Sequence, residues 1–198
     1  IRDDNNELYF PNDRYQYMPK SGYTEIIKNM LDHPNITVDL SKNFSKTDEK
    51  SYSHIFNSMP IDEYYDYKYG PLPYRSIKFH HYNLPVPKAQ EYPTINFVND
   101  GPYTRITEWK NYPNHGNNKY QTTLTWEEPC CYTQNLNERY YPVKDIDGRN
   151  RKNYEMYKSI NNKKTTFIGR CGLYVYLDMH QAISSSLAIV NKFKRGLK

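Results

Sequence analysis

The chain has 198 residues, with 27 Lys and Arg against 22 Asp and Glu and a net charge of +5. Its mean hydropathy is −1.00, yet aromatic residues make up 16% of it, including 22 tyrosines. Because each aromatic side chain buries a large area, we expect a folded chain with a very polar surface. The modest excess of Lys and Arg suits anionic ligands. These residues are scattered along the chain and form no concentrated basic stripe, which argues against a nucleic-acid-binding protein.

The cysteines and the apolar runs exclude further classes. Cys130 and Cys131 are adjacent, and together with Cys171 they match no Cys/His spacing of a zinc site, so we expect no metal. No secretory signal and no apolar run of membrane length is visible, which favours a cytoplasmic protein without membrane insertion. The sequence begins at Ile1 and contains no G-x-G-x-x-G. We therefore expect either part of a longer chain or a chain that works on a partner's cofactor.

The first elements predict the closing part of an α/β domain. Residues 1–20 are polar and predict an entry loop. A helix opens at 21–22, with apolar residues on one face and an acidic residue in its first turn. Residues 35–40 alternate and are β-branched, which predicts a strand, and a second short strand runs through 54–56.

The middle of the chain predicts an antiparallel sheet. Four β-rich runs, separated by Pro, Gly, Asn and Asp clusters, cover residues 76–82, 94–98, 103–110 and 120–126. Since no helical pattern interrupts them, we expect an antiparallel meander.

Helical periodicity returns toward the end of the chain. It predicts a helix over 149–160, a strand over 165–168 and a last helix that starts near Asp178. Asp178 is a good N-cap, and Gln181 stands where a capping-box partner reaches back.

Three segments could carry chemistry, each with an ordinary structural alternative. Arg105 on a strand could clamp a phosphate, or it could pair with Glu108 or another carboxylate on a sheet face. The pair Tyr140-Tyr141 could bind a diphosphate or a ring, or simply pack in the sheet. Residues 167–181, with Arg170 between a strand and a capped helix, could bind an anion or a cofactor, or could be a plain connector. No nucleophilic triad is visible.

Taken in order, several motifs resemble the bacterial UDP-galactopyranose mutases. The motifs are Asn12-Asp13-Arg14-Tyr15-Gln16 with Pro19 and Gly22-Tyr23-Thr24, Met59-Pro60-Ile61-Asp62-Glu63-Tyr64-Tyr65-Asp66-Tyr67, Tyr74-Arg75-Ser76, Ile95-Asn96-Phe97, Pro102-Tyr103-Thr104-Arg105-Ile106, Tyr140-Tyr141-Pro142 and Tyr176-Leu177-Asp178-Met179-His180. Each alone is a weak signal, whereas their ordered combination over nearly the whole chain is specific.

The resemblance implies an isomerase that interconverts UDP-galactopyranose and UDP-galactofuranose, with reduced FAD as the nucleophile. A covalent step that belongs to the cofactor is consistent with the lack of a protein nucleophile. The resemblance also implies a UDP-galactose-type sugar nucleotide as ligand, a missing N-terminal half that carries the FAD phosphate loop, and a homodimer. A catalytically inactive, diverged module that binds UDP-sugars or serves a structural role is the alternative.

Site residues carried over from the family fall into two groups. The substrate group is Arg2 on a mobile lid loop, Tyr15, Asn96, Arg105 as the fixed diphosphate arginine, Tyr141 and Tyr176. The FAD group is Arg170, Leu177, Asp178, Met179, His180 and Gln181.

Two departures from the family bear on FAD binding. Ile168 and Met59 stand where the family has glycines, so side chains could block a close approach of the backbone to the cofactor. The sequence therefore predicts an α+β fold: the closing part of an FAD-binding α/β domain and a mostly antiparallel substrate sheet. The expected segments are 1–20 entry loop, 21–68 FAD-domain part, 69–145 substrate domain and 146–198 closing FAD-domain part.

Overall fold

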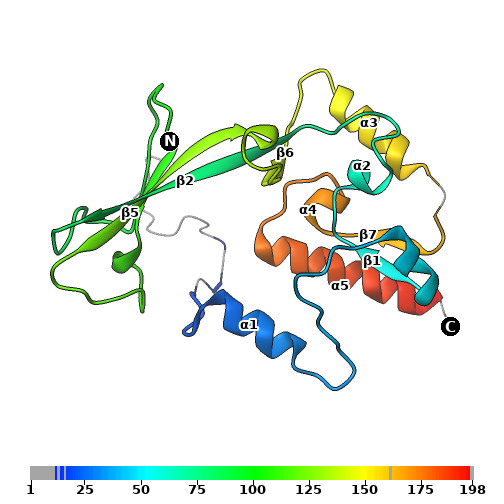
Figure 1. Ribbon diagram of the computed structural model, residues 1–198, viewed down its shortest axis with the longest axis horizontal. Helices are drawn as coiled ribbons and strands as arrows, with labels where there is room; N and C mark the ends of the chain where they lie inside the picture. The colour runs from blue at the N-terminus through cyan, green and yellow to red at the C-terminus, as the bar shows by residue number, and fades with distance from the viewer. Residues whose placement is uncertain (1–11, 13, 16, 161, 197–198) are drawn as a thin grey trace.

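The computed structural model describes residues 12, 14–15, 17–160 and 162–196. It contains a helical part around a small parallel sheet, and a long antiparallel sheet that extends away from it as an arm (Figure 1). The predicted α+β class is confirmed. The helices are α1 (Gly22–Leu31), α2 (Ile61–Tyr64), α3 (Arg149–Lys158), α4 (Gly169–Gly172) and α5 (Met179–Gly196), with 3-10 turns η1 (Lys46–Ser51), η2 (Trp109–Asn111) and η3 (Tyr132–Gln134). The strands are β1 (Ile55–Asn57), β2 (Tyr74–Leu84), β3 (Thr94–Asn96), β4 (Arg105–Glu108), β5 (Thr122–Cys131), β6 (Tyr141–Pro142) and β7 (Thr165–Phe167).

The arm is a five-stranded sheet in the order β3-β4-β5-β2-β6, and all its pairs are antiparallel. The four predicted strands are present, and β3-β4-β5 follow one another as in a meander. The meander prediction is wrong for β2, which pairs with β5 and not with β3. This long pairing joins residues 38 to 56 positions apart, so local turn signals could not reveal it.

The small sheet pairs β1 with β7 in parallel, with Ile55 opposite Thr165. The strands predicted at 54–56 and 165–168 and the helix at 149–160 are confirmed. The strand predicted at 35–40 is wrong, because these residues form the end of a turn followed by a segment without regular secondary structure, which pairs with no described strand. Alternation alone does not make a strand when no neighbour offers backbone partners.

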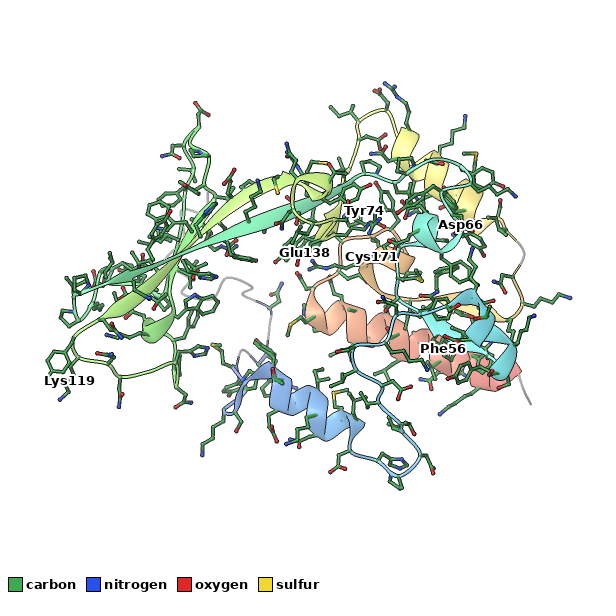
Figure 2. All side chains as sticks on the ribbon, in the orientation of Figure 1. Phe56, Asp66, Tyr74, Lys119, Glu138 and Cys171 are labelled. Carbon is green, nitrogen blue, oxygen red and sulfur yellow. The ribbon has the colours of Figure 1, made fainter. Side chains whose placement is uncertain are left out.

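Tyrosine dominates the core, which lies where the two parts meet. Leu72 and Tyr157 are fully buried, and Tyr74 is 1% exposed. The Tyr74 hydroxyl donates to the Cys171 carbonyl oxygen at 3.2 Å, and Figure 2 shows these two labelled residues close together at the junction. The high tyrosine content thus builds a core whose hydroxyls bond backbone groups of the neighbouring element.

An arginine fastens the sheet to the helical part. Arg139, just before β6, lies over the rings of Tyr74 and Tyr132 at 5.6 and 4.9 Å from their centroids. Its guanidinium also bonds Glu63 of α2 at 2.8 Å. Burial opposes the charge on Arg139, but Glu63 and its neighbours outweigh burial and raise its pKa. The two parts are therefore connected by packing and by an ion pair.

Residues at the start of α5 form half of the expected capping box. The backbone N–H of Asp178 donates to Oε1 of Gln181 at 2.8 Å. The predicted start of the last helix is confirmed. Among the described helices, none is both long enough and apolar enough to span a bilayer.

Candidate functional site

One face of the sheet carries a row of polar side chains. Asn96 on β3 lies opposite Arg105 on β4, and Arg105 lies opposite Glu127 on β5. Directly paired residues point to the same face, so these side chains meet. Arg105 Nε donates to Asn96 Oδ1 at 3.0 Å, and Arg105 Nη1 lies 3.5 Å from Glu127 Oε1. The Arg105 side chain is still 46% exposed, so its guanidinium N–H groups can donate hydrogen bonds to an anion that arrives from solvent.

Tyr141 lies on the same face, farther along the sheet. Tyr141 pairs with Arg75 on β2. Arg105 pairs with Glu127 on β5, and Glu127 in turn pairs with Phe79 on β2. Arg75 and Phe79 are four positions apart, an even number, so both point to one face. At about 3.3 Å per residue they are separated by about 13 Å along the strand. The face could therefore contact an elongated ligand at both places.

Arg170 of α4 is held by two carbonyls and two rings. Its Nε donates to the Leu177 carbonyl at 2.6 Å, and its Nη1 donates to the Tyr140 carbonyl at 2.9 Å. Its guanidinium carbon lies 4.5 Å from the Tyr176 ring centroid and 5.3 Å from the Tyr140 centroid. The two rings come from opposite sides of the junction, Tyr140 preceding β6 and Tyr176 following α4. This arrangement fixes the position of a cation at the junction.

Two predicted substrate tyrosines meet beside this cation, and Tyr176 is the one that contacts it. The rings of Tyr141 and Tyr176 are 6.0 Å apart in an edge-to-face arrangement. Burial, together with the carboxylate of Asp178, raises the pKa of Tyr176. Its hydroxyl therefore stays protonated and remains a hydrogen-bond donor at neutral pH.

The predicted FAD segment continues from this cation into the first turn of α5. Leu177 and Asp178 are half-buried, while Met179, His180 and Gln181 are exposed. A helix start presents backbone N–H groups and the positive end of the helix dipole. This turn, close in sequence to Arg170, suits a phosphate group.

The two family departures lie at the carboxyl ends of β1 and β7. Ile168 has φ −138° and ψ 169°, an extended conformation open to any residue, so the exchange creates no backbone strain. Gly169 next to it has φ +71° and keeps the glycine that this conformation favours. Met59 donates its backbone N–H to Asn57 Oδ1 at 2.9 Å. Asn57 Nδ2 is buried without an acceptor among the described residues, which fits an edge that receives a polar ligand.

The remaining predicted residues lie apart from these contacts. Tyr15 is 72% exposed and stacks on Tyr17 at 6.5 Å. Arg2 falls outside the described residues. The structure thus groups Asn96 with Arg105, and Tyr141 and Tyr176 with the FAD segment.

Sequence reasoning missed one residue of these groups, Glu127, and one contact, that of Tyr140 with Arg170. Glu127 beside Arg105 was not singled out, because only the β4–β5 register brings them together. Tyr140 was considered only for a diphosphate, a ligand ring or sheet packing, and its contact with Arg170 spans 30 residues. Its place in a Tyr-Tyr pair next to a predicted site residue was the one available signal.

Comparison with known proteins gives the family context. A family model described as UDP-galactopyranose mutase matches residues 1–176. A probable UDP-galactopyranose mutase from Klebsiella pneumoniae is 34% identical over 196 residues, which is 98% of this chain and 50% of the relative. A dTDP-fucopyranose mutase from Escherichia coli is 32% identical, over 93% of this chain and 50% of the relative. A UDP-galactopyranose mutase from Mycoplasma pneumoniae is 31% identical, over 92% and 49%. The chain spans about half the length of the curated relatives it matches.

Proposed function

Since the chain belongs to the UDP-galactopyranose mutase family, we propose that the protein interconverts UDP-galactopyranose and UDP-galactofuranose with reduced FAD. The observation that carries the proposal is the contact of Tyr176 with both Tyr141 and Arg170 at the junction. Residues assigned to substrate and to cofactor, from distant parts of the chain, lie side by side there. A flavin that reacts with a sugar requires this proximity.

Arg105 would hold the diphosphate of the substrate. Asn96 and Glu127 fix its guanidinium on the open face of the sheet. Negative charge grows on the diphosphate as the anomeric bond breaks, and a preorganised cation stabilises it. Tyr141 and Tyr176 would add hydroxyl donors. Arg2 as a lid arginine and Tyr15 as a diphosphate contact stay predictions.

Arg170 and the segment 177–181 would hold FAD. When bound and reduced, FAD supplies the nucleophile that takes the anomeric carbon. The donor set fits this group, because Arg170 and the first turn of α5 both suit pyrophosphate oxygens. Neither Ile168 nor Met59 introduces a left-handed backbone position, so neither departure argues against the cofactor on conformational grounds.

The proposed enzyme also needs an FAD phosphate-binding loop from outside residues 1–198. The chain contains no G-x-G-x-x-G, and we propose that this loop lies in the half of the relatives' length that the chain does not match. Isolated residues 1–198 are then expected to be inactive. The four segments given above as domains, the cytoplasmic location and the homodimer stay predictions.

A second candidate differs in the sugar nucleotide. The relative from Escherichia coli is a dTDP-fucopyranose mutase and is nearly as similar as the UDP-galactopyranose mutases. The same ring contraction on a dTDP-sugar would use the same diphosphate arginine. The nucleotide therefore has to be tested along with the reaction.

The test uses the protein as its gene encodes it, purified and incubated with FAD. We expect a flavin absorbance spectrum and, under dithionite, conversion of UDP-galactofuranose or of dTDP-fucofuranose, followed by chromatography. Arg105→Ala should keep the flavin and lose conversion, because Arg105 is assigned to substrate alone. A protein that binds no flavin contradicts the enzyme proposal. A protein that binds flavin but converts neither sugar supports the alternative of a catalytically inactive, diverged module.

A further inference from the structure

Tyr140 lies at the junction and has no assigned role. It directly precedes β6, the residue is 44% exposed, and its ring packs edge-to-face on Tyr141 at 5.7 Å. Its other described ring contact is the guanidinium of Arg170, 5.3 Å from the centroid. Because so much of the side chain is open to solvent, its loss should cost little stability by packing alone.

The position of Arg170 depends on both sides of the junction. Leu177, on its own side, accepts Nε, and Tyr140, on the sheet side, accepts Nη1. A guanidinium has five N–H donors, so three remain without an acceptor among the described residues. In addition, none of the described carboxylates lies within 4.0 Å of Arg170. The rings of Tyr140 and Tyr176 take the place that a carboxylate commonly occupies beside an arginine.

From this arrangement we infer that Tyr140 is a positioning residue, whose ring clamps Arg170 against Tyr176 so that the free N–H donors point at the pyrophosphate of FAD. This inference rests on the proposed function. It extends that function by linking the sheet to the cofactor site: movement of β6 relative to α4 would move the arginine. The ring and not the hydroxyl is the working part, since no described hydrogen bond involves the Tyr140 hydroxyl.

The test is FAD titration of the flavin-free protein, encoded in full, by quenching of flavin fluorescence. Tyr140→Phe keeps the ring and should bind FAD within about twofold of the parent. Tyr140→Ala should weaken binding about five- to tenfold, as expected for a partly exposed cation–π contact. Tyr92→Ala is the matched control, because this tyrosine is 63% exposed on a loop before β3, and it should leave the affinity unchanged.

Coupling to Arg170 separates positioning from general damage. Arg170→Lys should weaken FAD binding at least as much as Tyr140→Ala, and the double variant should be no weaker than Arg170→Lys alone. A readout without flavin is the exchange rate of the Arg170 Nε–H by NMR. It should rise in Tyr140→Ala and return to the parent value in Tyr140→Phe.

Three outcomes overturn the clamp: unchanged affinity in Tyr140→Ala, equal losses in the Phe and Ala variants, or additive losses in the double variant. Parent protein that fails to bind FAD overturns the proposed function, and the clamp with it. Parent protein that binds FAD, beside a Tyr140→Ala variant that binds equally well, overturns the clamp alone.

Discussion

The buried carboxylate of Glu108 offers a sharp test of how the sheet is held together. Glu108 ends β4 and is 0% exposed. Its Oε2 accepts the backbone N–H of Gln90 at 2.7 Å, its Oε1 accepts the hydroxyl of Thr122 at 2.6 Å, and the N–H of Ala89 reaches both oxygens at 3.1 and 3.2 Å. We predict that Glu108→Gln destabilises the protein markedly although its shape is nearly the same.

The magnitude follows from the number of donors. A glutamine oxygen in place of Oε2 keeps the donors Gln90, Ala89 and Asn111, whereas the NH2 group in place of Oε1 bonds the Thr122 hydroxyl only if that hydroxyl turns to accept. A charge-assisted bond contributes about 1.5–3 kcal/mol and a neutral one about 0.5–1.5 kcal/mol, so every bond to this group weakens when the acceptor becomes neutral. The expected loss in the free energy of unfolding is about 2–4 kcal/mol. Glu128→Gln on β5 is the control, since Glu128 is half-exposed beside His80 and should cost at most about 1 kcal/mol.

The pH dependence gives a second, independent readout. Burial opposes the charged form of Glu108, but the bonds from Thr122, Gln90 and Ala89 outweigh it and lower its pKa. The folded pKa is therefore below the ordinary value of about 4.3. Stability from this group is present above about pH 4.3 and is lost as the pH falls toward the folded pKa. The difference between the parent and Glu108→Gln should shrink in that range.

Urea denaturation at pH 7 and pH 4 measures both effects, and hydrogen exchange at the amides of Ala89 and Gln90 reports on the loop itself. These amides should lose protection in Glu108→Gln and keep it in Glu128→Gln. If the two variants are equally stable and the amides stay protected, the carboxylate does not hold this loop and the reasoning fails.

Two further predictions concern the backbone and the substrate. Gly172→Ala should lower the free energy of unfolding by about 1–3 kcal/mol in urea denaturation, because an added Cβ would lie 2.9 Å from the Asn57 carbonyl oxygen. Gly196→Ala is the control and should be neutral or slightly stabilising, since an added Cβ there would meet nothing within 4 Å. Equal costs in the two variants would contradict this packing. Arg105→Lys should weaken binding of UDP in calorimetry about tenfold while leaving FAD binding unchanged, since a lysine loses the bidentate fork; unchanged UDP affinity would remove Arg105 from the site.

Local patterns predicted the elements that depend on local contacts. The helix over 149–160 and the start of α5 follow from helical spacing and from the capping pair Asp178 and Gln181, all within a few residues of each other. The strand expected at 35–40 failed because a strand depends on a neighbour that the pattern does not contain. The pairing of β2 with β5 was likewise beyond reach, since it is set across the chain and not by a turn.

The candidate site shows the same division. Arg170 and Tyr176 are six residues apart, and both belong to the segment 167–181, which the sequence analysis had already singled out as one candidate site. The Tyr140 contact with Arg170 spans the junction between the two parts, so it depends on how the core packs them. The family resemblance supplied the individual residues, but it did not show which of them touch.

The structural alternative for Arg105 was an ion pair with Glu108 or with another carboxylate on the sheet face. The pair with Glu108 could have been excluded from the strand prediction itself, whereas the contact with Glu127 is a pair of the second kind. Residues three positions apart on a strand point to opposite faces. In the structure Glu108 is committed to the loop on its own face, and Arg105 meets a different carboxylate, Glu127, at 3.5 Å. A pair at that distance, with the arginine half-exposed, leaves donors that a phosphate can take without first breaking a buried ion pair. The alternation of the strand therefore points Glu108 to one face, where it holds the loop at Ala89 and Gln90, and points Arg105 to the other face, where a ligand can reach it.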